Sequence, residues 1–369
     1  MPRGRCDLLP MKLKILMSSA SATLWDAMEL HYVDGMRKQT DVVEFFGGEK
    51  SDACHKGILG RIKTRLFPKW SFRSVNQELL ELAKRNSPDV IFLFKAAYIF
   101  PVTLRRLRES GAKLVNYNAD HPFEFMSRGS GGSNVTNCIP LYDLHISYSR
   151  RIQKQMAQRF PNSATEVVPF GHFIDDNLFE KTVRAAGTEI EKVCFVGNPD
   201  QNRANTLHKL VAAGVPTDVY GHGWGKFLKP NESLKIHPAV LGEEYFQTLR
   251  KYRVQINLFR PHNLDSHNMR SFEVPAIGGV MLAEDSSEHR EFFEDGKEAF
   301  YFKSNHALIE LAKSLLKSPK RKIDAIRRAA RDRCVFDRSH YDERAVKVFE
   351  ILANLAGTKT QRTNYKDIM

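Results

Sequence analysis

Short apolar runs typical of β-strands alternate with helical patterns along almost the whole chain of 369 residues. In the first half the strand-like runs are Lys12–Met17, Asp41–Phe46, Asp89–Phe94, Lys113–Tyr117, Asp143–Tyr148 and Glu166–Val168. In the second half they are Lys192–Val196, Thr217–Tyr220, Val254–Leu258, Val280–Ala283 and Ala299–Phe302. Helices are predicted at Val75–Arg85, Pro101–Glu109, Gln201–Ala213, Glu243–Lys251, Ala307–Lys317, Lys320–Arg333 and Tyr341–Leu355. Such alternation is typical of parallel sheets joined by crossover helices. Because a chain of this length exceeds one ordinary core, we predict an α/β protein of two Rossmann-like domains.

The segment Pro169–Glu189 interrupts the alternation with polar and small residues, and we interpret it as the junction between the domains. The predicted division is a disordered leader (1–10), an N-terminal domain (11–175), a linker (176–190), a C-terminal domain (191–338), a terminal helix (339–356) and a tail (357–369). Two similar halves joined by a linker are expected to face a central cleft, and such clefts are preferred ligand sites.

The composition excludes several classes of protein. With 42% hydrophobic residues the chain can bury two cores, so global disorder is not expected. No apolar run approaches the roughly 20 residues of a membrane span, and the N-terminus lacks the apolar core of a signal peptide. The five cysteines are scattered without a C-x-x-C pair, which predicts free thiols in a reducing compartment. We therefore expect a cytoplasmic protein, and its net charge of +13 favours anionic partners.

The stretch Val254–Leu282 carries the strongest signal of a binding site. A strand pattern runs into a polar loop, a short helical segment then opens with Arg270 and Glu273, and Gly278 and Gly279 lead into the next strand. We expect these residues at the carboxyl ends of strands, where open α/β sheets bind ligands. Arg270 can bind a phosphate, and Glu273, on the same helix face, can accept hydrogen bonds from sugar hydroxyls. The pair predicts a nucleotide-sugar site; the alternative is a surface ion pair worth about 0.2–0.5 kcal/mol.

A second group of candidates follows the strands of the second half. Gly197 would let the backbone approach a phosphate, with Asn198 beside it and Arg203 on the next helix to neutralise a diphosphate. The alternative is an ordinary turn in which Asn198 caps the helix. Gly221, in a glycine-rich loop, is a further donor-binding candidate, and we expect Trp224 to anchor that loop.

Asp120 and His121 are the candidates in the first half, after the strand Lys113–Tyr117. Asp120 could deprotonate an acceptor hydroxyl, and His121 could hydrogen-bond a sugar or act as a base. The alternative is that Asp120 is a turn residue ahead of Pro122.

No metal site is predicted. Asp175 and Asp176 have no identifiable partner carboxylate nearby, so we interpret them as a solvated turn or a helix cap. The histidines of the second half lack metal-ligand spacing. His262 and Asn263, in the loop before Arg270, are instead donor-binding candidates.

Several motifs in this order resemble one known family. The second half carries Phe195–Asn198, Val219–Trp224, Ile256–Arg260, Met269–Gly279 and Phe336–Arg344. The first half carries Asn116–Pro122 and Val167–Gly171. Together they resemble the bacterial CgeB-like glycosyltransferases of the spore-maturation type, which have the two-domain GT-B fold. The resemblance covers roughly Met11 to Leu355.

The resemblance implies an enzyme that transfers a sugar from a nucleotide-diphosphate sugar to a glycan, lipid-linked or protein acceptor. It implies a donor held by the C-terminal domain, an acceptor entering from the N-terminal domain, no metal or other cofactor, and a last helix that crosses back to the N-terminal domain. Glu273 is similar to the second glutamate of the E-x7-E motif of retaining enzymes, which holds the donor ribose. The first position is Asp265, a departure. The alternative class is therefore a non-catalytic nucleotide-sugar-binding or scaffold protein in cell-surface or spore-coat assembly.

The basic stretch Lys56–Arg73 interleaves its cations with bulky apolar residues. Such a segment can lie in a membrane interface facing anionic lipid, which would make the protein peripheral at the inner face of the cell membrane. The alternative is an amphipathic helix packed on its own sheet with a solvated basic face. Nucleic acid is not the expected partner, because no nucleic-acid-binding module accompanies the stretch.

Overall fold

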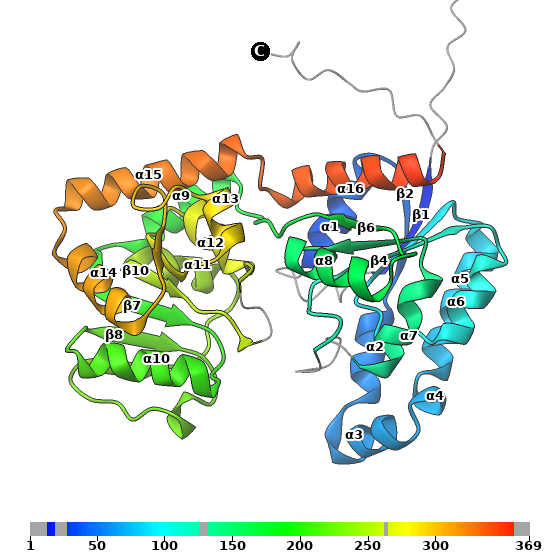
Figure 1. Cartoon of the computed structure of the whole chain (residues 1–369), viewed down its shortest axis with the longest axis horizontal. Helices are drawn as coiled ribbons and strands as arrows, with labels where there is room; N and C mark the ends of the chain where they lie inside the picture. The colour runs from blue at the N-terminus through cyan, green and yellow to red at the C-terminus, as the bar shows by residue number, and fades with distance from the viewer. Residues whose placement is uncertain (1–12, 19–27, 125–131, 262–264, 358–369) are drawn as a thin grey trace, which may run out of the picture. The chain divides into compact units, whose positions relative to one another are not determined.

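The computed structural model describes residues 13–18, 28–124, 132–261 and 265–357. The chain divides into two compact units, both drawn in Figure 1. Unit 1 takes in residues 1–147, 156–166 and 345–369, and unit 2 takes in residues 148–155 and 167–344. The predicted leader 1–10 and most of the predicted tail lie outside the described residues.

Unit 1 is built on a six-stranded parallel sheet with the strand order β2-β1-β3-β4-β5-β6. Its strands are β1 (Lys14–Ser18), β2 (Asp41–Phe45), β3 (Val90–Phe94), β4 (Lys113–Asn118), β5 (Leu144–Ser147) and β6 (Thr165–Val167). β3 is buried along its whole length, as its unbroken apolar sequence requires. Each strand lies within two residues of a predicted run, so the strand predictions for the first half are confirmed.

The helices of unit 1 cover the sheet and extend beyond it. They are α1 (Met28–Arg37), α2 (Gly47–Cys54), α3 (Gly57–Leu66), α4 (Pro68–Ser71), α5 (Arg73–Asn86), α6 (Pro101–Arg108) and α7 (Ser133–Cys138), with a 3-10 turn η1 (Ile139–Leu141). α5 packs on β1 and β2, and its apolar stripe includes the buried Val75 and Leu79. The predicted helix Pro101–Glu109 is α6, with Pro101 in the first turn, where a missing N–H costs no hydrogen bond.

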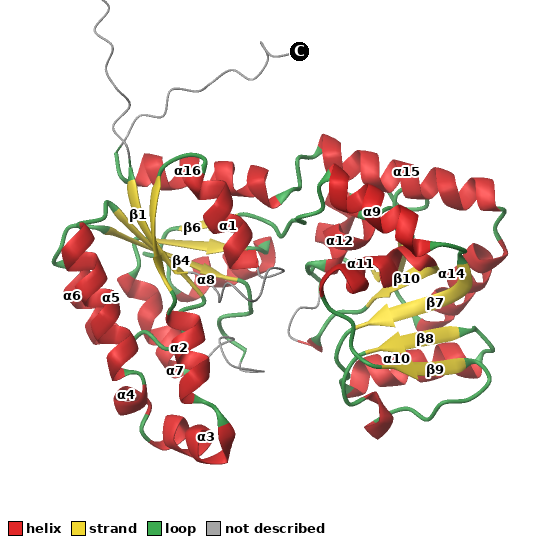
Figure 2. Cartoon of the chain, turned by 180° about the vertical axis from the view of Figure 1, so that it is seen from behind, coloured by secondary structure: helices red, strands yellow, loops and turns green. Residues whose placement is uncertain are grey.

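Unit 2 is built on a second six-stranded parallel sheet, with the order β12-β11-β10-β7-β8-β9, which Figure 2 shows in yellow. Its strands are β7 (Ile190–Val196), β8 (Thr217–Tyr220), β9 (Leu234–His237), β10 (Tyr252–Asn257), β11 (Met281–Glu284) and β12 (Phe300–Phe302). Five of them match predicted runs. β9 was not predicted.

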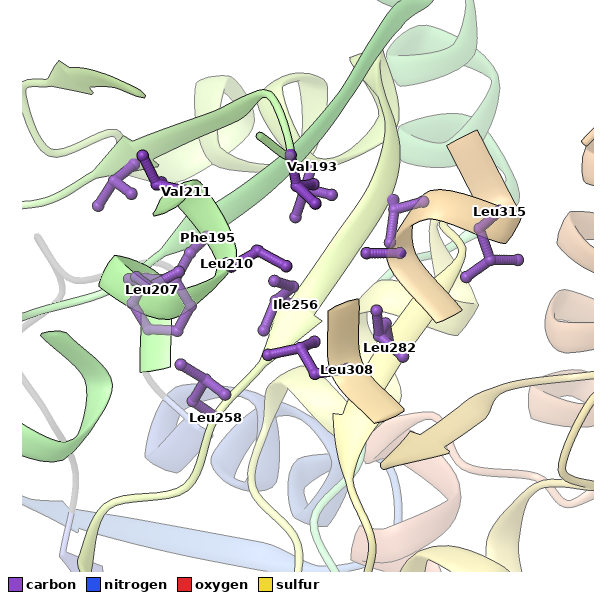
Figure 3. Close-up of a cluster of buried hydrophobic side chains, with 14 of the residues drawn as sticks. Val193, Phe195, Leu207, Leu210, Val211, Ile256, Leu258, Leu282, Leu308 and Leu315 are labelled. Atoms are coloured by element: carbon purple, nitrogen blue, oxygen red, sulfur yellow. The ribbon is translucent and has the colours of Figure 1, made fainter. Parts of the chain in front are cut away.

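Eight helices of unit 2 lie in the described residues. They are α9 (Asp176–Ala186), α10 (Gln201–Ala212), η2 (Trp224–Lys226), α11 (Gly242–Lys251), α12 (Arg270–Ala276), α13 (Ser287–Phe292), α14 (Asn305–Lys317) and α15 (Lys320–Phe336). The core forms where α10 and α14 pack together over the sheet. Figure 3 shows Leu207 and Leu210 from α10 meeting Ile256, Leu282 and Leu308.

Two helices carry the chain between the units. α8 (Arg150–Arg159) begins in unit 2, and its residues from Met156 onward belong to unit 1. α16 (Tyr341–Leu355) likewise begins in unit 2, and from Ala345 onward it belongs to unit 1, where it contacts α1. The expected return of the last helix to the N-terminal part of the fold is confirmed.

The segment predicted as a linker, 176–190, is largely helical. It contains helix α9, which packs against α11 within unit 2. Asp175 is the N-cap of α9 and accepts a hydrogen bond of 2.7 Å from the Leu178 N–H. Asp176 pairs with Arg331 at 2.6 Å. The interpretation of Asp175 as a helix cap is confirmed, and the segment predicted as a linker contains a packed helix.

Candidate functional site

Four candidate residues of unit 2 lie just after strand ends: Gly197 and Asn198 after β7, Gly221 after β8, and Arg270 near the end of β10. Asn257 is the last residue of β10, and its side-chain amide donates to Ser271 Oγ at 3.2 Å. The side-chain oxygen of Asn257, Oδ1, accepts a hydrogen bond of 2.7 Å from Asn268 Nδ2. These bonds fix the first turn of α12 to the carboxyl end of β10. Arg270 therefore lies where open α/β sheets bind ligands, as predicted.

Arg270 lies beside Gly197, the residue that follows β7. A Cβ atom built on Gly197 would be 3.4 Å from Arg270 Nη2. The guanidinium centre is 5.9 Å from the centroid of the Tyr245 ring. Arg270 Nε is buried without a hydrogen-bond partner, and within the described part of the chain no carboxylate forms an ion pair with this arginine. A positive charge held in place in this way is suited to bind an anion.

Glu273 is buried one turn further along α12. Tyr245, on α11, donates a hydrogen bond of 2.7 Å to Glu273 Oε2. Burial and the charge of Glu273 raise the pKa of Tyr245 well above its usual value, so the phenol remains a donor at neutral pH. Tyr245 contacts both predicted residues, yet its own position in the sequence carries no signal of this role. It could be found only from the packing of α11 on α12.

Arg203 is buried and already engaged by main-chain groups. Its guanidinium donates to the carbonyls of Asn198 at 3.0 Å and Leu258 at 2.8 Å, which ties the loop after β7 to the end of β10. Burial and the nearby charges of Arg270 and Arg260 lower the pKa of Arg203 to about 10. The three arginines thus form a cluster of like charge. Arg260 was not a predicted site residue, although it ends one of the motifs that carry the family resemblance.

The loop after β7 is fixed by close backbone contacts. A Cβ on Gly221 would lie 2.3 Å from the Gly197 carbonyl oxygen, so only glycine fits there without rearrangement. Trp224 Nε1 donates to the same carbonyl at 2.8 Å, and the ring is buried, consistent with the predicted anchoring role. The cap of α10 is Asp200, which accepts from the Arg203 N–H at 3.0 Å. The alternative reading of Asn198 as that cap is therefore wrong.

Gly278 and Gly279 lie at the opposite end of α12 from Arg270. They precede β11 and so lie at its amino end, which corrects the expectation that they stand at the carboxyl ends of strands. A Cβ on Gly279 would meet Gln255 Oε1 and Val274 Cγ1, each at 2.8 Å. The physical reason for glycine here is the close packing of α12 on β10.

Asp265 supports the start of α13. Its Oδ1 accepts hydrogen bonds from the backbone N–H of Ser287 at 3.0 Å and from the Ser287 hydroxyl at 3.3 Å. Its backbone φ is +55°, in the left-handed region. The donor-binding candidates His262 and Asn263 lie outside the described residues.

A buried carboxylate holds the segments around this loop together. Glu288 Oε2 accepts from Ser266 at 2.8 Å and from His267 Nδ1 at 2.6 Å. Glu288 Oε1 accepts from the Ser149 hydroxyl at 2.8 Å and the Arg150 N–H at 2.7 Å. Burial alone would raise the pKa of Glu288, but these hydrogen bonds lower it to about 2. This network was not predicted, because its donors and acceptor are far apart in the sequence.

In unit 1, Asp120 and His121 follow β4 as predicted. Asp120 pairs with Lys95 Nζ at 3.2 Å, and its N–H donates to the Asn118 side chain at 3.0 Å. The carboxylate is thus both part of a turn and accessible, so both readings of Asp120 stay open. Burial lowers the pKa of Lys95, but the negative charges of Asp120 and Glu29 together raise it by more, so the pKa lies above its usual value.

His121 is buried, and its orientation bears on its role. Its Nδ1 accepts a hydrogen bond of 3.3 Å from the Phe123 N–H. In the neutral ring the proton is then on Nε2, which can donate but not accept. This geometry favours the hydrogen-bonding role of His121 over that of a base.

Comparison with solved structures shows that the chain has the GT-B fold. HepE from Anabaena, solved in complex with UDP-glucose, is 15% identical, with a TM-score of 0.62 over 93% of this chain and 100% of that one. Sucrose-phosphate synthase from Thermosynechococcus elongatus is 9% identical, with a TM-score of 0.65 over 94% and 100%. A glycosyltransferase from Rickettsia africae is 10% identical, with a TM-score of 0.62 over 95% and 100%. At these identities the likeness establishes the fold alone.

The sequence itself also matches a family. Residues 203–350 match the family described as "Glycosyl transferase-like". The chain therefore carries a glycosyl transferase-like domain, which spans most of the C-terminal half, including Arg270 and Glu273. No curated protein matches the chain.

Proposed function

We propose that this protein is a glycosyltransferase of the CgeB-like type that uses a UDP-sugar or a related nucleoside-diphosphate sugar as donor. The GT-B fold, the glycosyl transferase-like match and a structural neighbour with bound UDP-glucose support a nucleotide-sugar donor. The observation that carries the proposal is Arg270, a guanidinium fixed at the ends of β7 and β10 with no carboxylate partner in the described residues.

The donor diphosphate would lie against Arg270, with Arg260 nearby and the backbone of Gly197, Asn198 and Gly221 forming the wall of the site. As the bond to the sugar breaks, negative charge grows on the leaving diphosphate. Arginine side chains that are already in position stabilise that charge without reorganisation. We assign Arg203 to positioning, because its hydrogen bonds go to Asn198 and Leu258. These cations supply the positive charge for a mechanism that needs no bound metal.

Glu273 would accept hydrogen bonds from the donor ribose, with Tyr245 orienting its carboxylate. Its similarity to the second glutamate of the retaining motif leads us to propose retention of the anomeric configuration. Asp265, at the first position of that motif, would support the loop through Ser287. His262 and Asn263 remain proposed contacts to the sugar, whereas Gly278 and Gly279 would shape α12 rather than touch the donor.

On the acceptor side, Asp120 would deprotonate the acceptor hydroxyl, with Lys95 holding the carboxylate. His121 would donate a hydrogen bond through Nε2. Among glycan, lipid-linked and protein acceptors we favour a lipid-linked one, because of the surface of α3 and α4 described below. Such a protein would work in the cytoplasm at the inner face of the membrane.

The decisive experiment compares UDP with uridine as ligands in calorimetry. A charge-assisted hydrogen bond contributes about 1.5–3 kcal/mol, so Arg270→Ala should weaken UDP binding by about 10- to 150-fold. Uridine lacks the phosphates, and its affinity should not change. Arg321→Ala, an exposed arginine of α15, is the matched control. Equal UDP affinity in wild type and Arg270→Ala, together with no turnover of any donor, would refute the proposal.

A non-catalytic nucleotide-sugar-binding protein is the second candidate. Asp265 favours it, because the position that is glutamate in the retaining motif is here engaged with Ser287. A screen of nucleotide sugars for binding, followed by a donor-hydrolysis assay on each ligand found, distinguishes the two. Tight binding without hydrolysis or transfer would favour the second candidate.

A further inference from the structure

Helices α3 and α4 expose six large apolar side chains to solvent. They are Ile58, Leu59, Ile62, Leu66, Phe67 and Trp70, with Leu59 82% and Trp70 61% exposed. Both views place α3 and α4 at the end of unit 1 farthest from α16 (Figures 1 and 2). The expectation of a helix packed on its own sheet is therefore wrong for these residues. Monomeric proteins rarely expose a contiguous apolar patch without a partner for it.

The sequence of α3 explains why its apolar face points outward. α3 packs against α2 and α4 through a face of small residues. A Cβ on Gly60 would lie 2.9 Å from the Cys54 carbonyl oxygen, and Thr64, four residues on, is buried. At 3.6 residues per turn, Ile58, Ile62 and Leu66 lie on the opposite face. The helix is thus amphipathic with its apolar side turned away from the unit's core.

The same segment is strongly basic. Lys56–Arg73 contains the exposed cations Lys56, Arg61, Lys63, Arg65, Lys69 and Arg73 and no aspartate or glutamate. Lys63 Nζ lies 3.9 Å from the centroid of the Trp70 ring, so the cations border the apolar side chains. An apolar strip with a basic border complements an anionic lipid surface, where apolar groups enter the interface and cations meet headgroup phosphates. Tryptophan is itself enriched at that depth.

We infer that the α3–α4 surface, defined as residues 56–73, docks this protein on an anionic phospholipid bilayer. No helix in the described part of the chain is long and apolar enough to span a membrane, so the contact we infer is peripheral. This inference deepens the proposed function, on whose membrane location it rests, by naming the docking surface and the class of lipid, and it does not depend on the donor site. UDP binding and vesicle binding can therefore fail separately.

The test is co-sedimentation of the full chain with two kinds of vesicle: phosphatidylcholine alone, and an equimolar mixture with phosphatidylglycerol. We expect binding to the anionic vesicles only, weakened by added salt. Each basic residue near such a surface contributes about a factor of five to partitioning, so the triple change Arg61→Gln, Arg65→Gln and Lys69→Gln should reduce binding by roughly 100-fold. The pair Leu59→Ser and Leu66→Ser should also release the protein.

Matched controls come from α15. Val335 and Phe336 are comparably exposed, at 65% and 78%, and their change to serine should leave vesicle binding intact. Changing Arg321 and Lys322 to glutamine controls for net charge. Trp70 fluorescence should shift to the blue on anionic vesicles, and Trp70→Phe should abolish the shift. Equal loss of binding in the α15 and α3 variants overturns the inference. The inference is also overturned if the wild-type protein does not bind anionic vesicles but forms dimers that the Leu59→Ser and Leu66→Ser changes disrupt.

Discussion

Glu288 gives the sharpest prediction for the stability of unit 2. This carboxylate is only 4% exposed and accepts hydrogen bonds from two segments that are distant from it in sequence, Ser149–Arg150 and Ser266–His267. His267 Nε2 accepts a hydrogen bond from the Phe170 N–H at 3.2 Å, so the His267 proton is on Nδ1 and points at Glu288. Burial lowers the pKa of His267 more than Glu288 raises it, and the ring is neutral at pH 7. The network is thus a buried carboxylate that accepts hydrogen bonds from Ser149, Arg150, Ser266 and His267.

The magnitude follows from the pKa of Glu288, which falls from 4.5 to about 2 on folding. That difference stabilises the folded state by up to about 3 kcal/mol at pH 7. Because the folded-state pKa is the lower one, the stabilisation is complete above about pH 4.5. It is lost as the pH falls from there toward about 2. Glu288→Gln removes the charge and places an amide N–H₂ against existing donors, so the free energy of unfolding at pH 7 should fall by about 2–4 kcal/mol.

Urea denaturation of wild type and Glu288→Gln, repeated from pH 7 to pH 3, measures this effect. The gap in unfolding free energy between them should shrink by about 2 kcal/mol over that range, because the unfolded wild type binds a proton below about pH 4.5 while its folded state stays largely ionised. Glu310→Gln, an exposed glutamate of α14, should behave like wild type throughout. A gap between wild type and Glu288→Gln that is the same at pH 7 and pH 3 would refute the reasoning.

Two further predictions concern the proposed donor site. Gly221→Ala would place a Cβ 2.3 Å from the Gly197 carbonyl oxygen and should lower both the melting temperature and the affinity for UDP. Gly225→Ala is the control: its Cβ would have no atom within 4 Å, so neither quantity should change. Tyr245→Phe removes the hydrogen-bond donor to Glu273 Oε2 and should weaken binding of UDP by roughly tenfold. Binding of pyrophosphate, which has no ribose, should weaken less. Calorimetry with both ligands checks this, and equal losses of affinity would contradict the assigned role of Glu273.

The strands could be predicted because their signal is local. Buried parallel strands such as β3 need unbroken apolar runs, and such runs are visible without knowledge of the fold. β9 (Leu234–His237) was not predicted, because it is a four-residue edge strand with polar residues at alternate positions. α9 was not predicted, because its polar and small residues are typical of a linker. The segment is nevertheless helical, and α11 packs against its apolar side.

The candidate site likewise contains contacts that could be predicted from local sequence and contacts that could not. The neighbourhood of Arg270 and Gly197 could be expected from two strand ends, because parallel strands bring their carboxyl ends to one edge. Tyr245 could not, since it is brought to Glu273 by a contact between α11 and α12. Gly278 and Gly279 show the reverse failure: a local pattern suggested ligand contact where the fold needs close packing on β10.

The contrast between Arg203 and Arg270 shows how the site can prefer an anion. Both are arginines near the end of β7, but Arg203 gives its hydrogen bonds to two carbonyls, while Arg270 has no such partner in the described residues. Burial lowers the pKa of Arg203 most, and the repelling charges of Arg270 and Arg260 lower it further, although Asp200, paired with Arg203 at 3.4 Å, opposes them. A bound diphosphate would convert that repulsion into attraction. In the proposed donor site this change would favour binding of the phosphates, and UDP should therefore raise the free energy of unfolding more than uridine does at equal ligand concentration.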